Sequence, residues 1–157
     1  MTCTVRQARP ADLDDLVDLL ALLFAIEKDF DFDAERQRQG IALVLAHENA
    51  VLLVAEATNK VVGMCSGQLT ISTAEGGWAL LVEDVVVSEA WQGQGVGREL
   101  MKGLEKWARA RKVARLQLLA DRNNREALNF YTKCGWQTTD LICLRKRLPA
   151  FKDTPNF

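Results

Sequence analysis

The chain has 157 residues, of which 48% are hydrophobic and 26% are charged, the composition of an ordinary globular domain. Its 20 Lys and Arg residues nearly balance its 21 Asp and Glu residues, so the basic footprint of a nucleic-acid-binding protein is missing. It contains no apolar run of about 18 residues for a membrane span, and its N-terminus lacks an apolar signal core. We therefore expect one cytoplasmic domain over residues 1–157, with no nucleic-acid or membrane partner.

The cysteines do not suggest a metal site. Cys3, Cys65, Cys134 and Cys143 form no C-x-x-C pair, and His47 is the only histidine. We expect reduced, mostly buried thiols and no bound metal.

The N-terminal part predicts a strand and two helices. Residues 4–8 form the strand, and Pro10 opens a helix that begins at residue 11 or 12. A second helix covers residues 34–47. The acidic segment 27–33 between them is predicted to be a solvated linker, with Phe30 and Phe32 inserted into the core.

A hairpin of strands follows, over residues 51–56 and 61–72, with a turn at 57–60. Gly63 and Gly67 indicate a bulge or a close backbone approach. Residues 78–88 are apolar at both alternating sets of positions, which predicts a strand covered on both faces.

Glu83 and Asp84 interrupt this apolar strand. Because side chains alternate along a strand, we expect the two carboxylates to point to opposite faces, so at least one begins inside a buried element. An unpartnered buried carboxylate has a raised pKa or lines a wet cleft. The alternative is a structural role, in which backbone amides or an arginine hold the carboxylates.

A glycine-rich loop at residues 92–97 and an amphipathic helix come next. The glycines permit positive φ, and the helix N-terminus offers free N–H groups, a combination suited to an anionic diphosphate. Arg98 stands where a dinucleotide-binding G-x-G-x-x-G loop needs glycine, and the Gly-Lys-Ser/Thr of a nucleotide P-loop is absent. The pattern that remains is Q-x-x-G-x-G.

The C-terminal part predicts a strand at residues 115–120 and then the helix motif N-R-E-A-L-N-F-Y-T-K-C-G-W at 124–136. A final hairpin is predicted from residues 137–140 and 141–148. Residues 149–157 are expected to be a loosely held tail.

The Q-x-x-G-x-G loop and the N-x-x-A-x-x-F-Y-x-x-x-G-W helix lie in order, about 30 residues apart, and together resemble the GNAT superfamily of N-acetyltransferases. Trp136 replaces the usual Phe. The run Glu83-Asp84-Val-Val-Val followed by Gln-Gly-Gln-Gly resembles in particular the glucosamine-phosphate N-acetyltransferases. The resemblance implies a mixed α/β sheet with splayed parallel central strands, in the order strand, two helices, three strands, helix, strand, helix, two strands.

The resemblance also implies acetyl-CoA as co-substrate and direct transfer to a primary amine of a small molecule or peptide in a ternary complex. Glu83 is then the general base, directly or through a water, with Asp84 as second choice. Tyr131 donates a proton or hydrogen bond to the coenzyme thiolate; the alternative is that it only caps the core. The residues expected to bind the coenzyme are Val85, Val86, Val87, Gln92, Gly93, Gln94, Gly95, Val96, Gly97, Arg98, Asn124 and Tyr131.

In this family the segment between the first two helices borders the acceptor site, which adds a second interpretation of residues 27–33 as an acidic edge that attracts a cationic amine. Two other functions remain open. One is a non-catalytic acetyl-CoA-binding or sensor module, and the other is a nucleotide-dependent oxidoreductase, which the glycine spacing disfavours. The acceptor, the acyl group and homodimerisation through the final hairpin or an edge strand are left open.

Overall fold

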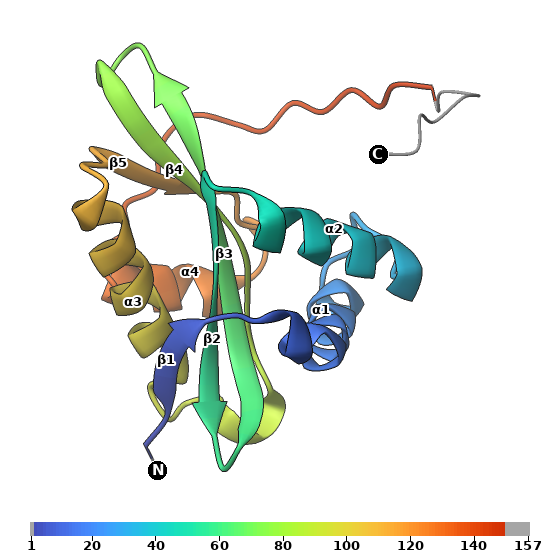
Figure 1. The fold of residues 1–157 in the computed structure, drawn as a ribbon. Coiled ribbons are helices and arrows are strands. Elements are labelled where there is room, and N and C mark those ends of the chain that lie inside the picture. Colours follow the sequence, from blue (N-terminus) through green and yellow to red (C-terminus); the bar gives the residue numbers. More distant parts are fainter. Residues whose placement is uncertain (1, 150–157) are drawn as a thin grey trace.

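The structure of the protein is a computed structural model, of which residues 2–149 are described. Five strands form one sheet in the order β1-β2-β3-β4-β5, and only β4 and β5 are parallel (Figure 1). The strands are β1 (Thr4–Gln7), β2 (Ala50–Ala57), β3 (Lys60–Ser72), β4 (Gly77–Val87) and β5 (Arg115–Leu118). The helices are α1 (Leu13–Ile26), α2 (Ala34–Ala46), α3 (Val96–Ala110) and α4 (Arg125–Lys133), with short 3-10 turns η1 (Pro10–Asp12) and η2 (Glu89–Trp91).

The helices cover the two faces of the sheet. Helices α1 and α2 pack on one face, and α3 and α4 lie on the other (Figure 1). The apolar stripe of α3 enters the larger core through Val96, Leu100 and Leu104, while Leu16 and Leu20 of α1 enter the smaller core on the opposite face. The mixed α/β class and the helix positions predicted from the sequence are confirmed.

The hairpin of β2 and β3 is also confirmed. Thr58 and Asn59 both have positive φ, and the flanking residues Ala57 and Lys60 pair, as in a two-residue turn that matches the twist of the strands. A Cβ on Gly67 would lie 3.0 Å from the Leu80 side chain, so this glycine permits the close approach that its position in the strand predicted.

Strand β4 contains a β-bulge that the sequence did not reveal. The ladder with β3 pairs Ser66 with Glu83 and Met64 with Val86, which leaves two residues of β4 opposite Cys65. Asp84 occupies the bulge with φ of +54°. Before the bulge the even-numbered residues Leu80 and Val82 face α3, whereas after it Val86 faces α1.

The prediction that Glu83 and Asp84 point to opposite faces is therefore wrong. Glu83 shares the face of its partner Ser66, which lies on the α1 side because its neighbour Cys65 belongs to the α3-side core. The Ser66 hydroxyl is 3.1 Å from Asp84 Oδ2, so the Asp84 carboxylate reaches the same face. Strict alternation fails because the bulge inserts an extra residue.

The bulge also ends the contact between the two parallel strands. The ladder of β4 and β5 runs from Ala79 with Arg115 to Val82 with Leu118 and then stops. Residues 83–87 of β4 continue, still paired with β3 but without a strand on their other side. This one-sided stretch is the splay expected between the central parallel strands.

The final hairpin predicted at residues 137–140 and 141–148 is wrong. The chain bends at Asp140, as a hairpin requires, but residues 141–149 form no strand and stay exposed. The apolar run 141–144 therefore contacts no sheet. The alternation suits a strand, but in the described part of the chain no backbone–backbone hydrogen bond joins residues 137–149 to the outer edge of β5 or to any other strand.

Three further expectations concern the surface and the tail. The expectation of mostly buried thiols is wrong, because only Cys65 of the four free cysteines is buried, and Cys143 is exposed where its predicted strand is not formed. No helix between residues 2 and 149 is long and apolar enough to cross a bilayer. The tail expected over residues 149–157 lies, from residue 150 onward, outside the described residues.

Candidate active site

The glycine loop lies at the open end of α3, directly after β4. Gly93 and Gly95 have φ of +71° and +85°, and Gly95 is the N-cap of α3. No side chain caps this helix, so the N–H groups of its first turn point out of the helix end without a side-chain acceptor. A Cβ built on Gly93 or Gly95 would meet nothing within 4 Å. The loop is thus an open cradle of backbone donors at the positive end of a helix dipole, which fits the two phosphates of coenzyme A.

The two glutamine side chains of the loop hold its shape. Gln92 Nε2 donates to the Val87 carbonyl at 3.0 Å, and Gln94 Nε2 donates to the Ala90 carbonyl at 2.8 Å. Both side-chain amides therefore donate to backbone carbonyl groups within or next to the loop. Gly97 has a different role, because a Cβ there would lie 3.1 Å from the ring of Phe130, so it allows α3 and α4 to pack closely.

The two carboxylates of β4 lie on the α1 side of the sheet, beside the splay. Burial raises the pKa of Asp84, and the hydrogen bond from Ser66 opposes that rise. Partial burial raises the pKa of Glu83, and the adjacent Asp84 charge raises it further. The Glu83 side chain still reaches solvent, so it can exchange protons with water, whereas Asp84 is more enclosed.

The Ser66 hydroxyl sits between two acceptors. Its oxygen is 3.1 Å from Asp84 Oδ2 and 3.1 Å from the Glu83 carbonyl oxygen, and one hydroxyl proton can point fully at only one of them. The Ser66 hydroxyl thus gives Asp84 a structural partner that the Glu83 carboxylate lacks.

Glu27, which follows α1, joins these carboxylates and was not singled out from the sequence. Burial raises the pKa of Glu27, and the charges of Asp84, Asp29, Asp121 and Glu83 raise it further. Residues far apart in sequence thus form one acidic group, which we call the acidic cluster: Glu27, Asp29, Glu83, Asp84 and Asp121. The only signal in the sequence was the acidic character of segment 27–33.

The prediction that Phe30 and Phe32 are inserted into the core is wrong. Both rings are exposed, and Phe30 packs against Phe24 with ring centroids 5.8 Å apart. The aromatic residues therefore form part of the surface beside the acidic cluster.

Tyr131 of α4 approaches the same place from the other face of the sheet. Its ring packs edge-on against Phe130 and Trp136, at centroid distances of 5.2 and 5.9 Å. Burial is the main cause that raises the pKa of Tyr131 to about 12, and the acidic groups of Cys65, Glu27 and Cys134 add to the rise. Glu27 belongs to the α1 side and Tyr131 to the α3 side, so groups from both faces meet at the splay.

The other residues predicted to bind the coenzyme lie on β4, at the start of α3 and at the N-cap of α4. Asn124 caps α4, with its Oδ1 accepting from the Ala127 N–H at 3.0 Å, which leaves the amide nitrogen to reach a ligand. Val85 and Val87 face α3 after the bulge, and Val86 faces α1. Arg98 stands in the first turn of α3, whereas Lys102 forms an ion pair with Glu99 at 2.8 Å. Within residues 2–149, no three His, Cys, Asp or Glu side chains are grouped to hold a metal ion.

Fold and site together define a mixed α/β protein with a glycine-rich cradle of backbone N–H groups next to splayed parallel strands. A sequence model of the acetyltransferase (GNAT) family matches residues 13–136, and the chain belongs to this family. It is therefore an acyl-coenzyme A-dependent N-acetyltransferase, in a family that uses acetyl-CoA as co-substrate.

Individual relatives differ in substrate. The chain is 27% identical to an aminoalkylphosphonate N-acetyltransferase of Salmonella typhimurium, over 86% of this chain and 85% of that protein. It is 28% identical to an aminoglycoside N(6')-acetyltransferase of Stenotrophomonas maltophilia, over 88% of this chain and 89% of that protein. Mouse N-alpha-acetyltransferase 80 is 48% identical over 59 residues, which are 38% of this chain but only 18% of that protein.

A solved structure supports the fold. The glucosamine-6-phosphate N-acetyltransferase of Arabidopsis thaliana superposes with a TM-score of 0.75 at 19% identity, covering 93% of this chain and 100% of that one.

Proposed function

We propose that the protein transfers the acetyl group of acetyl-CoA to a primary amine of a small molecule that carries more than one positive charge. The observation that carries this proposal is that α1 packs on β4, where, besides burial, Asp84 raises the pKa of both Glu27 and Glu83 and Glu27 raises that of Tyr131, next to the glycine cradle. One end of the site suits an anionic diphosphate, and the other end suits a cation.

The cradle orients the coenzyme. Backbone N–H groups of residues 92–98 hold the pyrophosphate, and Arg98 adds charge. The backbone of Val85, Val86 and Val87 along the one-sided stretch of β4 and the Asn124 amide bind the pantetheine arm. When bound, acetyl-CoA supplies a thioester whose carbonyl carbon bonds to the amine nitrogen as its bond to sulfur breaks.

Glu83 removes the proton that the amine must lose. A typical primary ammonium has a pKa near 10, so only about one molecule in a thousand is deprotonated at pH 7. The raised pKa of Glu83 brings its basicity closer to the working pH, and its contact with solvent lets the proton pass directly or through one water. Asp84, enclosed and bonded to Ser66, raises the pKa of Glu83.

Tyr131 stabilises the departing sulfur by hydrogen bonding. With its pKa raised to about 12, the phenol stays protonated and is a weaker acid than a typical thiol of pKa about 8.5. Complete proton transfer from the phenol to the thiolate is therefore unfavourable, and donation of a hydrogen bond is the role that its acidity allows. A backbone N–H near Val85 is the fixed donor for the oxyanion.

The charge of the acceptor follows from the acidic cluster. Glu27, Glu83 and Asp84 repel one another, and a second ammonium group on the acceptor relieves that repulsion, whereas a phosphate or phosphonate adds to it. An aminoglycoside-like acceptor, of the kind named for the Stenotrophomonas maltophilia relative, fits this charge better than the aminoalkylphosphonate named for the Salmonella typhimurium relative.

The test is thiol release from acetyl-CoA with pairs of acceptors that differ only in charge. We expect a higher kcat/KM for a diaminoalkane than for the monoamine of equal length, for glucosamine than for glucosamine 6-phosphate, and for an aminoglycoside than for 2-aminoethylphosphonate. Preference for the phosphorylated members would contradict the cationic acceptor. Binding of acetyl-CoA in calorimetry without thiol release for any amine would favour the alternative, a non-catalytic acetyl-CoA-binding module.

A further inference from the structure

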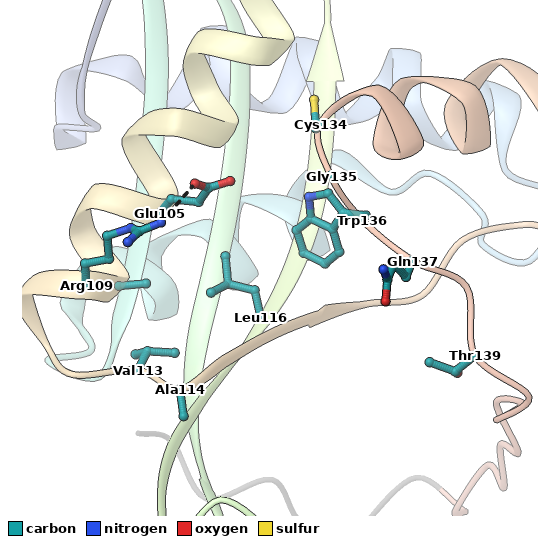
Figure 2. Close-up of a pocket in the computed structure, with 11 residues that line it drawn as sticks. Glu105, Arg109, Val113, Ala114, Leu116, Cys134, Gly135, Trp136, Gln137 and Thr139 are labelled. Atoms are coloured by element: carbon teal, nitrogen blue, oxygen red, sulfur yellow. Dashed lines mark ion pairs between the residues drawn. The ribbon is translucent and has the colours of Figure 1, made fainter.

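The segment after α4 crosses from the β5 side of the molecule to the acidic cluster. It starts at Trp136, whose N–H donates to the Tyr131 carbonyl at 3.0 Å and whose ring lies edge-on to the Tyr131 ring. Figure 2 shows Trp136, Gln137 and Thr139 along one side of a hollow beside β5. From there residues 137–148, which we call the strap, run as an extended chain toward α1 and α2 (Figure 1). One end of the strap is therefore fixed next to Tyr131.

The far end of the strap is held by one side chain. Within residues 2–149, the only salt bridge that joins the strap to another element is that of Arg145 with Asp29, with Nη1 3.5 Å from Oδ2. The Arg145 guanidinium also lies 4.9 Å from the centroid of the Phe30 ring, within the range of a cation–π contact. Phe30 packs in turn against Phe24 of α1. A carboxylate and an aromatic face thus hold the same cation.

Little else holds the strap in this position. No backbone–backbone hydrogen bond in the described part of the chain involves residues 137–149. The exposed fractions of the large apolar side chains of the strap are 79% for Leu141, 67% for Ile142, 86% for Leu144 and 74% for Leu148. Because these side chains are already in water, movement of the strap sacrifices little apolar burial. The strap can therefore leave α1 and α2 at little cost beyond the two contacts of Arg145.

The place that Arg145 occupies belongs to the acidic cluster. Burial is the main cause that raises the pKa of Glu27, and the charges of Asp84 and Asp29 raise it further. Asp29 is thus within electrostatic reach of the carboxylates beside the splay. The guanidinium is a cation, as is the second positive group of the proposed acceptor, so the two are attracted to the same carboxylate.

We propose that Arg145 is a specificity-determining residue, which occupies the place of the acceptor's second cation on Asp29 and Phe30 and is displaced by it. The inference rests on the proposed function, because it takes the acceptor to carry more than one positive charge. An amine with a single nitrogen places it at the thioester and leaves Arg145 where it is. A diamine places its second nitrogen on Asp29 and releases the strap. Arg145 therefore raises the KM of acceptors with two positive charges and leaves that of monoamines unchanged.

The first experiment measures the kinetics of Arg145→Ala with 1,4-diaminobutane and with butylamine. An exposed ion pair and an exposed cation–π contact are each weak, and together they correspond to about a three- to thirtyfold change in an equilibrium constant. We expect the KM for diaminobutane to fall by that factor, while kcat and the KM for butylamine change by less than about twofold. Arg145→Lys, which keeps the charge, should restore most of the wild-type KM. Arg147→Ala, which removes another exposed charge of the strap, is the matched control and should change neither KM.

The outcomes separate this inference from the proposed function. An unchanged KM for diaminobutane in Arg145→Ala, or an equal fall for both amines, would overturn the role of Arg145 and leave the proposed acceptor intact. A diamine that is no better an acceptor than butylamine in either chain would contradict both. Adding Asp29→Asn to the Arg145→Ala chain should cancel the gain for diaminobutane. A gain that survives would overturn the competition for Asp29.

The second experiment follows the strap without acetyl transfer. A fluorophore is attached to the exposed Cys143 in a Cys3→Ser/Cys134→Ser chain, in which the remaining thiol, Cys65, is buried. With coenzyme A bound, we expect fluorescence anisotropy to fall as diaminobutane is added and to stay constant with butylamine at equal ionic strength. In Arg145→Ala the anisotropy should be low from the start. Constant anisotropy with diaminobutane would overturn the displacement, whereas a fall without thiol release in the kinetic assay would support the displacement and count against the proposed acceptor.

Discussion

Replacement of Gly95 by alanine tests the backbone cradle most sharply. Gly95 has φ of +85°, a conformation that costs an L-residue about 1–2 kcal/mol, and no neighbouring atom lies within 4 Å of the added Cβ. The strain is therefore conformational rather than steric. The loop either keeps the strained positive φ or relaxes to negative φ. Relaxation turns the N–H groups of the first α3 turn away from the ligand.

The expected magnitude follows from the hydrogen bonds that are lost. One charge-assisted bond to phosphate contributes about 1.5–3 kcal/mol, so losing one weakens the Kd for acetyl-CoA about ten- to a hundredfold. Gly76→Ala is the matched control, because Gly76 also has positive φ, at +64°, and open space around its Cβ, but lies in the distant β3–β4 turn.

Both variants should lower Tm by about 2–8 °C, since a change of 1 kcal/mol corresponds to about 2–4 °C in a domain of this size. Only Gly95→Ala should weaken the binding of acetyl-CoA, measured by isothermal titration calorimetry. An unchanged Kd for Gly95→Ala, or equal weakening by both variants, would refute the assignment of the loop.

Three further predictions concern the side chains at the splay. Tyr131→Phe should lower kcat at least tenfold while the Kd for acetyl-CoA stays within twofold; an unchanged kcat would remove its role at the sulfur. Glu83→Gln should lower kcat/KM for the amine about 10²–10⁴-fold, the usual contribution of a general base, and should abolish the acidic limb of the pH profile; a retained limb would assign the base elsewhere. Asp84→Asn should shift the acidic limb of the pH–rate profile to lower pH in initial-rate assays, because removing the Asp84 charge lowers the pKa of Glu83. It should also raise the free energy of unfolding of the ligand-free protein at pH 7, because folding raises the pKa of Asp84 and ionised Asp84 therefore destabilises the folded state. This gain should vanish in unfolding measurements below about pH 4, near the pKa of an Asp in the unfolded chain, where Asp84 is protonated in both states.

Most elements of the fold could be predicted because each has a local cause. The apolar stripe of α3, the proline that opens the first helical turn and the Thr58-Asn59 turn all depend on neighbouring residues. The cradle could be predicted for the same reason, since its glycines and the helix start are adjacent in the chain.

The remaining features depend on contacts between distant residues. The bulge at Asp84 needs Ser66 across the ladder, and the only local indication was that Asp tolerates the left-handed conformation better than most residues. Glu27 joins Glu83 and Asp84 only because α1 ends beside β4. The C-terminal apolar run was assigned to a hairpin because its sequence suits a strand, but whether it pairs with the free edge of β5 is a long-range contact that local sequence does not decide.

The central claim is that main-chain N–H groups of residues 92–98 hold the two phosphates of an acyl carrier. A crystal structure with acetyl-CoA tests it directly. The account predicts the pyrophosphate within hydrogen-bonding distance of those N–H groups, with the sulfur between Glu83 and Tyr131. Density for the pyrophosphate anywhere else on the molecule would contradict it.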